Sequence, residues 1–392
     1  MRKNSVSLAD WQPTKRQIKL VNKVIKSGRL TYGNYHRELE EKFAKKHNFK
    51  YCIFTNSGTS ALQVAWHYLK EINGWKDGDE VLVPSLTFVA TVNTLLQNRL
   101  KPVLVDVELE TFNMDPHLIE TKITNRTKAI CPVDLLGRPC NMYAIREIAN
   151  KYHLKIVEDS CETMFVNHQL TDHNITTAPV GSLADIAAYS SYLAHIISTG
   201  VGGFLCTNNK KWADDMRSMI WHGRDNYYLN IDDAKKNKKR LLHTRFKFNR
   251  VGYSYRLTEL EAVIGVDEVN RAEEIIKKRK ENAEYLQSLL ICFAGNIILP
   301  RLQEDNAWMF FPIVCADHID RDKLCLFLER RGVQTRYIMP LINQPVYKGM
   351  WKEKDYPVAD YVNKHGFSIG CHQFLRDSDL RYVAKCFEEY FK

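Results

Sequence analysis

Residues 185–207 decide the fold, and they read DIAAYSSYLAHIISTGVGGFLCT. The start of this stretch is an apolar run with β-branched and aromatic side chains, which predicts a buried strand. A loop ending at His195 follows, and the glycine-rich turn GVGG at 200–203 leads into a second apolar strand. No lysine occurs between Lys155 and Lys210. The basic side chain of this stretch is therefore an imidazole.

A second feature is a short expected strand, Tyr51–Thr55, that leads into the small residues NSGTS at 56–60 and a helical run over Ala61–Leu69. At such a helix start, free backbone N–H groups and the helix dipole both point at an anion. On its own the turn is a weak signal, because clusters of Ser, Thr and Gly are more often plain turns or helix caps. It is a candidate phosphate cradle.

Further apolar runs predict strands at Val81–Val83, Lys101–Val107, Lys128–Val133 and Lys155–Val157. Helical segments separate them, including one that opens at Asp115 with Pro116 in its first turn. Strands without alternation, interleaved with helices, predict a mostly parallel sheet that is covered on both faces. Asp159 closely follows the last of these strands, at the end where open α/β sheets bind ligands.

The carboxy-terminal third has a different pattern. Thr258 and Glu261 form a capping box that opens a long helical segment running to about Leu290. Alternating strands and two more helices follow, which predicts a small α+β unit. We place the domain boundary here, with a large domain over residues 1–257 and a connecting helix and small domain over residues 258–392.

Composition excludes some classes of protein. Apolar residues make up 45% of the chain and charged residues 26%, as in ordinary globular proteins. The net charge of +10 favours anionic partners, and a phosphorylated substrate explains it without a nucleic-acid-binding signature. The ten cysteines include no C-x-x-C pair, which argues against zinc and iron–sulfur sites and for reduced thiols. With no apolar leader or membrane-length apolar stretch, we expect a soluble, cytoplasmic protein.

Two histidines, His168 and His173, lie in a polar stretch without a further ligand pattern. We expect both at the surface rather than on a metal, and we predict no metal site.

Together these motifs resemble the sugar aminotransferases of the DegT/DnrJ/EryC1/StrS family, fold type I enzymes that use pyridoxal 5'-phosphate (PLP). The family pattern is roughly S-F-x-x-x-K-x-x-T-T-G-E-G-G, and Ser190, Gly200, Gly202 and Gly203 fit it. His195 stands at the position of the lysine that forms an imine with PLP. The resemblance covers roughly residues 15–390. It implies a large α/β domain with a mostly parallel seven-stranded sheet and a smaller α+β domain.

The resemblance also assigns roles to individual residues. It implies that the cradle binds the PLP phosphate, that Phe88 stacks on the ring and that Asp159 pairs with the pyridine nitrogen. Glu162 replaces a common glutamine, and Ser254 replaces the asparagine of a G-Y-N-Y-R motif that serves the partner subunit's cofactor. The cofactor-binding set is Gly58, Thr59, Ser60, Phe88, Asp159, Glu162, Ser190, His195 and Ser254. The substrate-binding set is Thr31, Tyr32, His222, Arg224, Arg250, Arg256 and Arg336, helped by a basic loop within residues 232–250.

A lysine-to-histidine change at this position marks a branch of the family, the nucleotide-4-keto-6-deoxyhexose 3-dehydratases, which use the amine form of the cofactor (PMP). The resemblance therefore implies a dehydratase with His195 and Asp159 as catalytic residues, an amino donor such as glutamate, and a homodimer with shared sites. Three alternatives stay open: an aminotransferase that tolerates noncovalent cofactor, a non-catalytic binder of PLP or sugar nucleotides, and an engineered transaminase. Glu162 and the segment SIGCH at 368–372 argue against the last, because one mutation would not alter them too.

Overall fold

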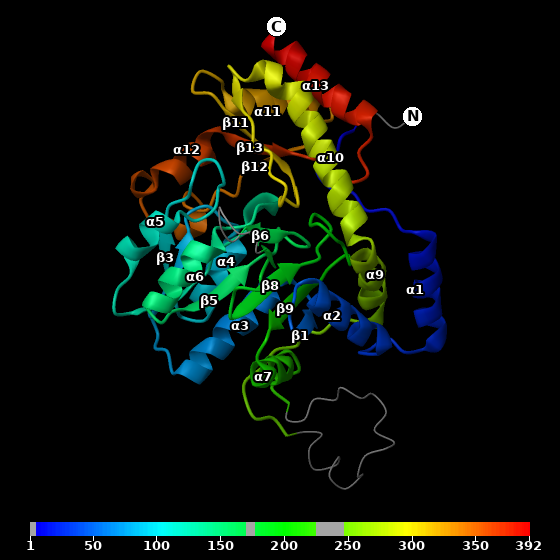
Figure 1. The fold of residues 1–392 in the computed structure, drawn as a ribbon, viewed down its shortest axis with the longest axis vertical. Helices are drawn as coiled ribbons and strands as arrows, with labels where there is room; N and C mark the ends of the chain where they lie inside the picture. The colour runs from blue at the N-terminus through cyan, green and yellow to red at the C-terminus, as the bar shows by residue number, and fades with distance from the viewer. Residues whose placement is uncertain (1–4, 170–176, 225–246) are drawn as a thin grey trace.

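The computed structural model describes residues 5–169, 177–224 and 247–392. Its centre is a seven-stranded sheet with strand order β1-β9-β8-β5-β4-β2-β3 (Figure 1). The strands are β1 Tyr51–Thr55, β2 Glu80–Pro84, β3 Lys101–Val105, β4 Thr127–Ile130, β5 Lys155–Asp159, β8 Ile186–Ser190 and β9 Gly203–Thr207. Every pairing from β3 to β8 is parallel, and β9 runs antiparallel to both β8 and β1. The predicted mostly parallel, seven-stranded α/β fold is confirmed.

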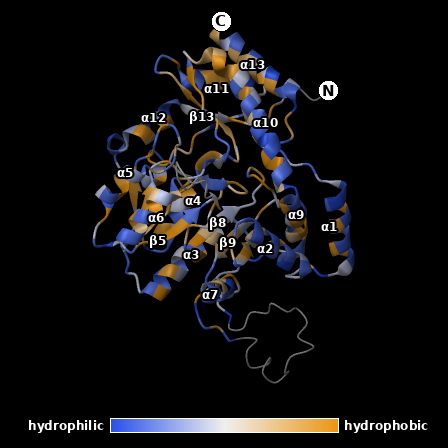
Figure 2. Cartoon of the chain, in the orientation of Figure 1, coloured by the Kyte–Doolittle hydropathy of each residue, from blue (hydrophilic) through white to orange (hydrophobic). Residues whose placement is uncertain are grey.

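The first two thirds of the chain also form helices, most of which pack against this sheet. They are α1 Lys15–Ser27, α2 Asn34–Lys46, α3 Gly58–Asn73, α4 Val89–Gln97, α5 Pro116–Ile119, α6 Met142–Lys151 and α7 Lys210–Ile220. The strands are almost wholly buried, and apolar residues gather in them and in α6 (Figure 2). The absence of alternation in the sequence of these strands reflects burial on both faces.

The capping box at Thr258 is present, and it opens α9 Glu259–Asn270. The predicted single helix to Leu290 is divided at Arg271, whose φ of −99° and ψ of 5° separate α9 from α10 Ala272–Leu290. Beyond it lies an antiparallel sheet in the order β10-β11-β13-β12. Its strands are β10 Ile297–Ile298, β11 Phe311–Cys315, β12 Thr335–Tyr337 and β13 Gly366–Ile369, with helices α11 Arg321–Arg330, α12 Pro357–His365 and α13 Asp377–Phe391. The domain boundary at residue 257 stays a prediction.

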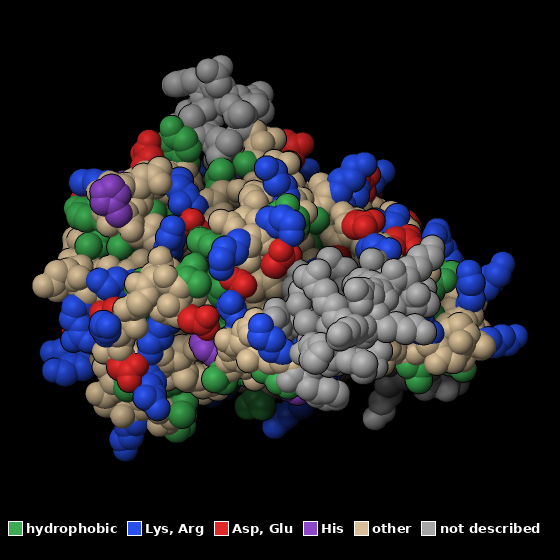
Figure 3. Space-filling view, turned by 90° about the horizontal axis from the view of Figure 1, so that it is seen from below, with side chains coloured by type: hydrophobic (Ala, Val, Ile, Leu, Met, Phe, Trp, Pro, Cys, Tyr) green, Lys and Arg blue, Asp and Glu red, His purple; other side chains and the backbone are tan. Residues whose placement is uncertain are grey.

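All ten cysteines are free thiols, as expected. Lys and Arg side chains are spread over the face seen in Figure 3 and interleaved with Asp and Glu. Among the helices of the described ranges, none has both the length and the apolar character needed to cross a bilayer.

The expectation that His168 lies at the surface is wrong. It lies in β6 Asn167–Gln169, which pairs with β7 Thr177–Pro179, and its side chain is buried. Its Nε2 lies 2.9 Å from Glu158 Oε1, and Asp134 completes a buried cluster of three. The sequence hid this contact because Glu158 belongs to β5, which reads only as a buried strand. His173 lies outside the described residues.

Candidate active site

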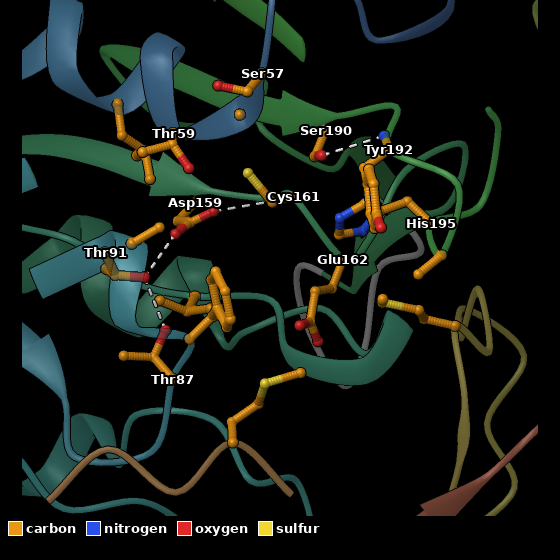
Figure 4. Close-up of a pocket in the computed structure, with 18 of the residues that line it drawn as sticks. Ser57, Thr59, Thr87, Thr91, Asp159, Cys161, Glu162, Ser190, Tyr192 and His195 are labelled. Atoms are coloured by element: carbon orange, nitrogen blue, oxygen red, sulfur yellow. Dashed lines mark hydrogen bonds between the residues drawn. The ribbon is translucent and has the colours of Figure 1, made fainter. Parts of the chain in front are cut away.

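A cavity of about 380 Å³ lies at the carboxyl edge of the central sheet. Its floor comes from residues that follow β1, β2, β4, β5 and β8, and its other side comes from the carboxy-terminal third. The polar lining residues include Ser57, Thr59, Thr87, Thr91, Asp159, Glu162, Ser190 and His195 (Figure 4). Arg336 also lines the cavity. Because parallel strands end at one edge, side chains far apart in the chain meet here.

The small-residue turn after β1 opens onto this cavity at the start of α3. Ser57 is the N-cap, and its Oγ accepts a hydrogen bond from Ser60 N at 3.0 Å. Gly58 and Thr59 line the cavity, whereas the Ser60 hydroxyl bonds to Asn56 Oδ1 at 2.5 Å. Position 203 must be glycine, because a Cβ there would overlap the backbone of Ser57 and Gly58. The turn therefore presents a helix N-terminus to the cavity, as an anion site requires.

Asp159 is a buried carboxylate at the end of β5. Its Oδ2 accepts a hydrogen bond from Thr91 Oγ1 at 2.8 Å, and its Oδ1 accepts one from Cys161 N at 3.2 Å. Burial raises the pKa of Asp159 above its ordinary value, and these hydrogen bonds offset part of the shift. Within the described ranges no cation pairs with it. A cationic ligand atom beside Asp159 would relieve the cost of its buried charge.

His195 lies on the same cavity, in the loop after β8. Its Nδ1 is buried and bonds to no described atom. Burial and the positive charge of Arg279 lower the pKa of His195 to about 4. The imidazole is therefore neutral near neutral pH and free to accept a proton.

Glu162 is the second carboxyl group of the cavity. Its Oε2 accepts a hydrogen bond from Leu136 N at 2.8 Å, and burial raises its pKa to about 7. Figure 4 shows Glu162 and His195 on one side of the cavity and Asp159 with Thr91 on the other. The cavity thus combines an anion cradle, a carboxylate without a counter-ion and two groups that can hold or release protons.

Most residues expected to bind substrate do not line the cavity of this chain. The Tyr32 hydroxyl donates to Glu40 Oε2 at 3.1 Å, and Arg250 forms ion pairs with Asp215 at 2.9 Å and Glu71 at 3.4 Å. Thr31 is exposed. Of this set, only Arg336 lines the cavity.

A separate group surrounds the G-Y-S-Y-R segment. The Arg256 guanidinium lies 4.8 Å from the centre of the Trp221 ring, and it donates hydrogen bonds to His222 Nε2 at 3.3 Å and Ser254 Oγ at 3.0 Å. Arg224 packs over the ring of Phe248. Ser254, His222, Arg224 and Arg256 therefore lie together but outside this chain's own cavity. Of the basic loop, residues 232–246 lie outside the described residues.

The sequence did not single out Thr91 or Arg279. The hydroxyl groups of Thr87 and Thr91 are hydrogen-bonded to each other at 2.8 Å, and the Thr91 hydroxyl also donates to Asp159. Both residues follow strand β2, Thr87 just before α4 and Thr91 in its first turn, and a position after a parallel strand is a signal that could have placed them at the ligand-binding edge of the sheet.

Comparison with known proteins identifies the family. The sequence model of the DegT/DnrJ/EryC1/StrS aminotransferase family matches residues 12–388. This chain belongs to that family.

Relatives within the DegT/DnrJ/EryC1/StrS family carry different names. The chain is 30% identical to the lipopolysaccharide biosynthesis protein RfbH of Salmonella typhimurium, over 96% of this chain and 89% of that protein. It is 29% identical to the GDP-perosamine synthase of Caulobacter vibrioides, over 91% of this chain and 90% of the synthase. The structure of E. coli GDP-4-keto-6-deoxy-D-mannose-3-dehydratase, with hydrated PLP bound, superposes with a TM-score of 0.83. That match has 26% identity and covers 97% of this chain and 99% of the dehydratase.

As a DegT/DnrJ/EryC1/StrS chain, the protein is a fold type I enzyme whose cofactor is PLP or PMP. The cavity fits this cofactor on structural grounds. The N-terminus of α3 suits its phosphate, the buried Asp159 suits a protonated ring nitrogen, and Phe88, 56% exposed at the cavity, is available to cover the ring.

Proposed function

We propose that this enzyme is a PMP-dependent dehydratase that removes the 3-hydroxyl group of a nucleotide-linked 4-keto-6-deoxyhexose. One observation carries the proposal: the cavity holds the His195 imidazole, and no lysine is among the described residues that line it. An imidazole cannot form a stable imine with PLP, but it can accept and donate a proton. A 3-dehydratase for such a sugar is also among the similar structures.

The chain's own residues would bind and orient the cofactor. The α3 cradle with Gly58, Thr59 and Ser60 would hold the phosphate, and Phe88 and Ser190 would flank the ring. Asp159 would hold a proton on the ring nitrogen, because its buried carboxylate ionises more easily beside a cation. When bound, the cofactor supplies an electron sink next to the sugar carbonyl carbon.

His195 would move the proton that elimination requires. Its neutral imidazole would accept a proton from carbon and then donate that proton to the 3-oxygen as the C–O bond breaks, so that the hydroxyl group leaves as water. A low pKa suits the second half of this exchange, since the imidazolium then releases its proton readily. Transamination with an amino acid such as glutamate would restore the amine. Arg336, the guanidinium at the cavity, would bind an anionic group of donor or substrate.

We also infer a homodimer with shared sites. Ser254, His222, Arg224 and Arg256 do not line the cavity of their own chain. Nearby, Val251 is 75% exposed and Phe248 is 48% exposed, as expected of side chains that a second copy would cover. In the dimer these polar residues would reach the partner subunit's cavity.

The test is mass spectrometry of the sugar product after incubation of the protein with PLP, glutamate and a nucleotide-linked 4-keto-6-deoxyhexose. The proposal predicts a 3-deoxy sugar, and the His195→Asn variant should form almost none. A 3-amino or 4-amino sugar as the main product would overturn the assignment.

The second candidate is a nucleotide-sugar aminotransferase that holds its cofactor noncovalently. It is favoured by the family description and by a relative named GDP-perosamine synthase. This candidate predicts an amino sugar, formed faster by the His195→Lys variant than by the wild type.

A further inference from the structure

Arg279, on helix α10, lies directly behind the His195 segment and outside the cavity. Its side chain is 2% exposed, and Nη2 donates a hydrogen bond to the carbonyl oxygen of His195 at 3.3 Å. Nη1 donates to the carbonyl oxygens of Trp308 at 3.1 Å and Met309 at 3.0 Å. One guanidinium therefore joins two backbone segments that each contribute a residue, His195 or Met309, to the cavity lining.

The second segment extends this network to Glu162. Met309 lines the cavity, and its backbone N–H donates to Leu136 O at 3.1 Å. The N–H of Leu136 in turn donates to Glu162 Oε2. Arg279 thus connects the backbone of His195 with the segment that orients the buried Glu162 carboxyl group.

Arg279 is also a buried charge with unusual partners. Within the described residues it bonds to carbonyl oxygens and to no carboxylate, and its Nε has no hydrogen-bond partner. Burying a cation without a counter-ion is costly. Burial accordingly lowers the pKa of Arg279 to about 10, with Cys371 and Glu268 opposing the shift. The guanidinium remains charged near neutral pH, so its field acts on the imidazole in front of it.

We propose that Arg279 is a positioning residue for His195: it fixes the backbone of the His195 segment, and its buried charge favours release of a proton from the imidazolium. The other titratable or charged side chains around the cavity are Asp159, Cys161, Glu162, Tyr192 and Arg336. After burial, Arg279 is the group that lowers the pKa of His195. The catalytic consequence rests on the proposed dehydratase function, in which His195 must return the proton that it has taken. The effect of Arg279 on the proton affinity of His195 does not depend on that function.

The test is the titration of His195 in the cofactor-free protein by histidine-labelled NMR, with the signal assigned by loss in the His195→Gln variant. In the wild type, His195 should titrate well below its ordinary pKa of about 6.5. The Arg279→Met variant should raise the proton affinity of His195 by up to about tenfold, which is one pKa unit, because burial is the larger cause of the low pKa and remains. Arg279→Lys, which keeps the charge, should stay near the wild type. Lys277→Met removes an exposed charge from the same helix and should change nothing.

A wild-type His195 that titrates at or above about 6.5 overturns the proposal even if the Arg279→Met variant does not fold. A folded Arg279→Met variant with unchanged His195 titration overturns it as well. If that variant titrates as expected while the wild type yields an amino sugar, the proposed dehydratase fails and the role of Arg279 stands. For an active dehydratase, the acidic limb of the kcat profile should move to higher pH in Arg279→Met.

Discussion

Thr91 Oγ1 donates a hydrogen bond to Asp159 Oδ2 at 2.8 Å, and this contact joins the start of α4 to the end of β5. Cys161 supports the same carboxylate, with its backbone N–H donating to Asp159 Oδ1. The pairing helps to keep a buried carboxylate ionised where the ring nitrogen of the cofactor is expected.

The Thr91→Val variant should bind PLP about tenfold more weakly. A hydrogen bond to a charged group contributes about 1.5–3 kcal/mol, and a water molecule at Asp159 would compensate for part of the lost hydrogen bond. Absorbance titration of the cofactor-free protein with PLP measures the change. Thr94→Val is the matched control, since Thr94 lies on the same helix and, among the described residues, its hydroxyl bonds to the Thr91 carbonyl and not to Asp159. Equal affinities in all three proteins would contradict the role of Thr91.

Asp159→Asn should stabilise the cofactor-free protein while it abolishes activity. Burial raises the pKa of Asp159, so its contribution to stability is fully present below the unfolded-state pKa and is lost as pH rises through the folded-state pKa. Near neutral pH the ionised carboxylate therefore costs stability, on the order of 1 kcal/mol for each unit of pKa shift. Urea unfolding should show the variant as the more stable protein at neutral pH, with the gain shrinking in acid. A gain that is independent of pH would contradict this account.

Gly203→Ala should distort the phosphate cradle, because the added methyl group would overlap the backbone of Ser57 and Gly58. Overpacking of this kind costs about 1–3 kcal/mol, and PLP affinity should fall together with stability. Gly295→Ala is the control, since a Cβ there meets nothing within 4 Å. Thermal melts with and without PLP compare the two variants. A Gly203→Ala variant that leaves both melts unchanged would refute the close packing of β9 on the cradle.

The buried cluster behind Asp159 predicts a pH-dependent contribution to stability. Burial opposes the protonation of His168, but the charge of Glu158 and its hydrogen bond raise the pKa of His168 to about 9. His168 therefore stabilises the fold fully below its ordinary value of 6.5, and this contribution is lost as pH rises through about 9.

His168→Gln should cost about 3–5 kcal/mol at mildly acidic pH, as expected when one partner of a buried ion pair is removed. This loss of stability should shrink at pH values above the folded-state pKa of His168. His117→Gln, at an exposed position, should be neutral throughout. Denaturant unfolding of the wild type and both variants across this pH range measures the loss of stability. A loss for His168→Gln that grows with pH would show that His168 is neutral in the folded protein.

Local patterns predicted the parts of this protein that depend on local sequence. Strand β1 matches its predicted bounds, Tyr51–Thr55, since an apolar run between turn residues needs little tertiary information. A short motif marks each of Gly58, Asp159 and His195 in the sequence, and they line one cavity because the parallel sheet brings the strand ends together.

Other features depend on contacts that the sequence does not mark. Arg279 is 84 positions from His195 in the chain, and it reads in the sequence as one more charge on a polar helix. The Tyr32 hydroxyl donates to Glu40, eight residues later in the chain, and Tyr32 does not line the cavity of its own chain; its role in substrate binding stays a prediction. His168 looked exposed because its partner Glu158 lies inside the central sheet.

The most direct test of the central claim is a single turnover with PMP whose amine nitrogen is isotopically labelled, and with no amino donor present. If His195 directs elimination, the nucleotide sugar should lose its 3-hydroxyl group, and the label should leave as free ammonium. Label retained in the sugar, with the 3-hydroxyl group still in place, would show that the enzyme is an aminotransferase.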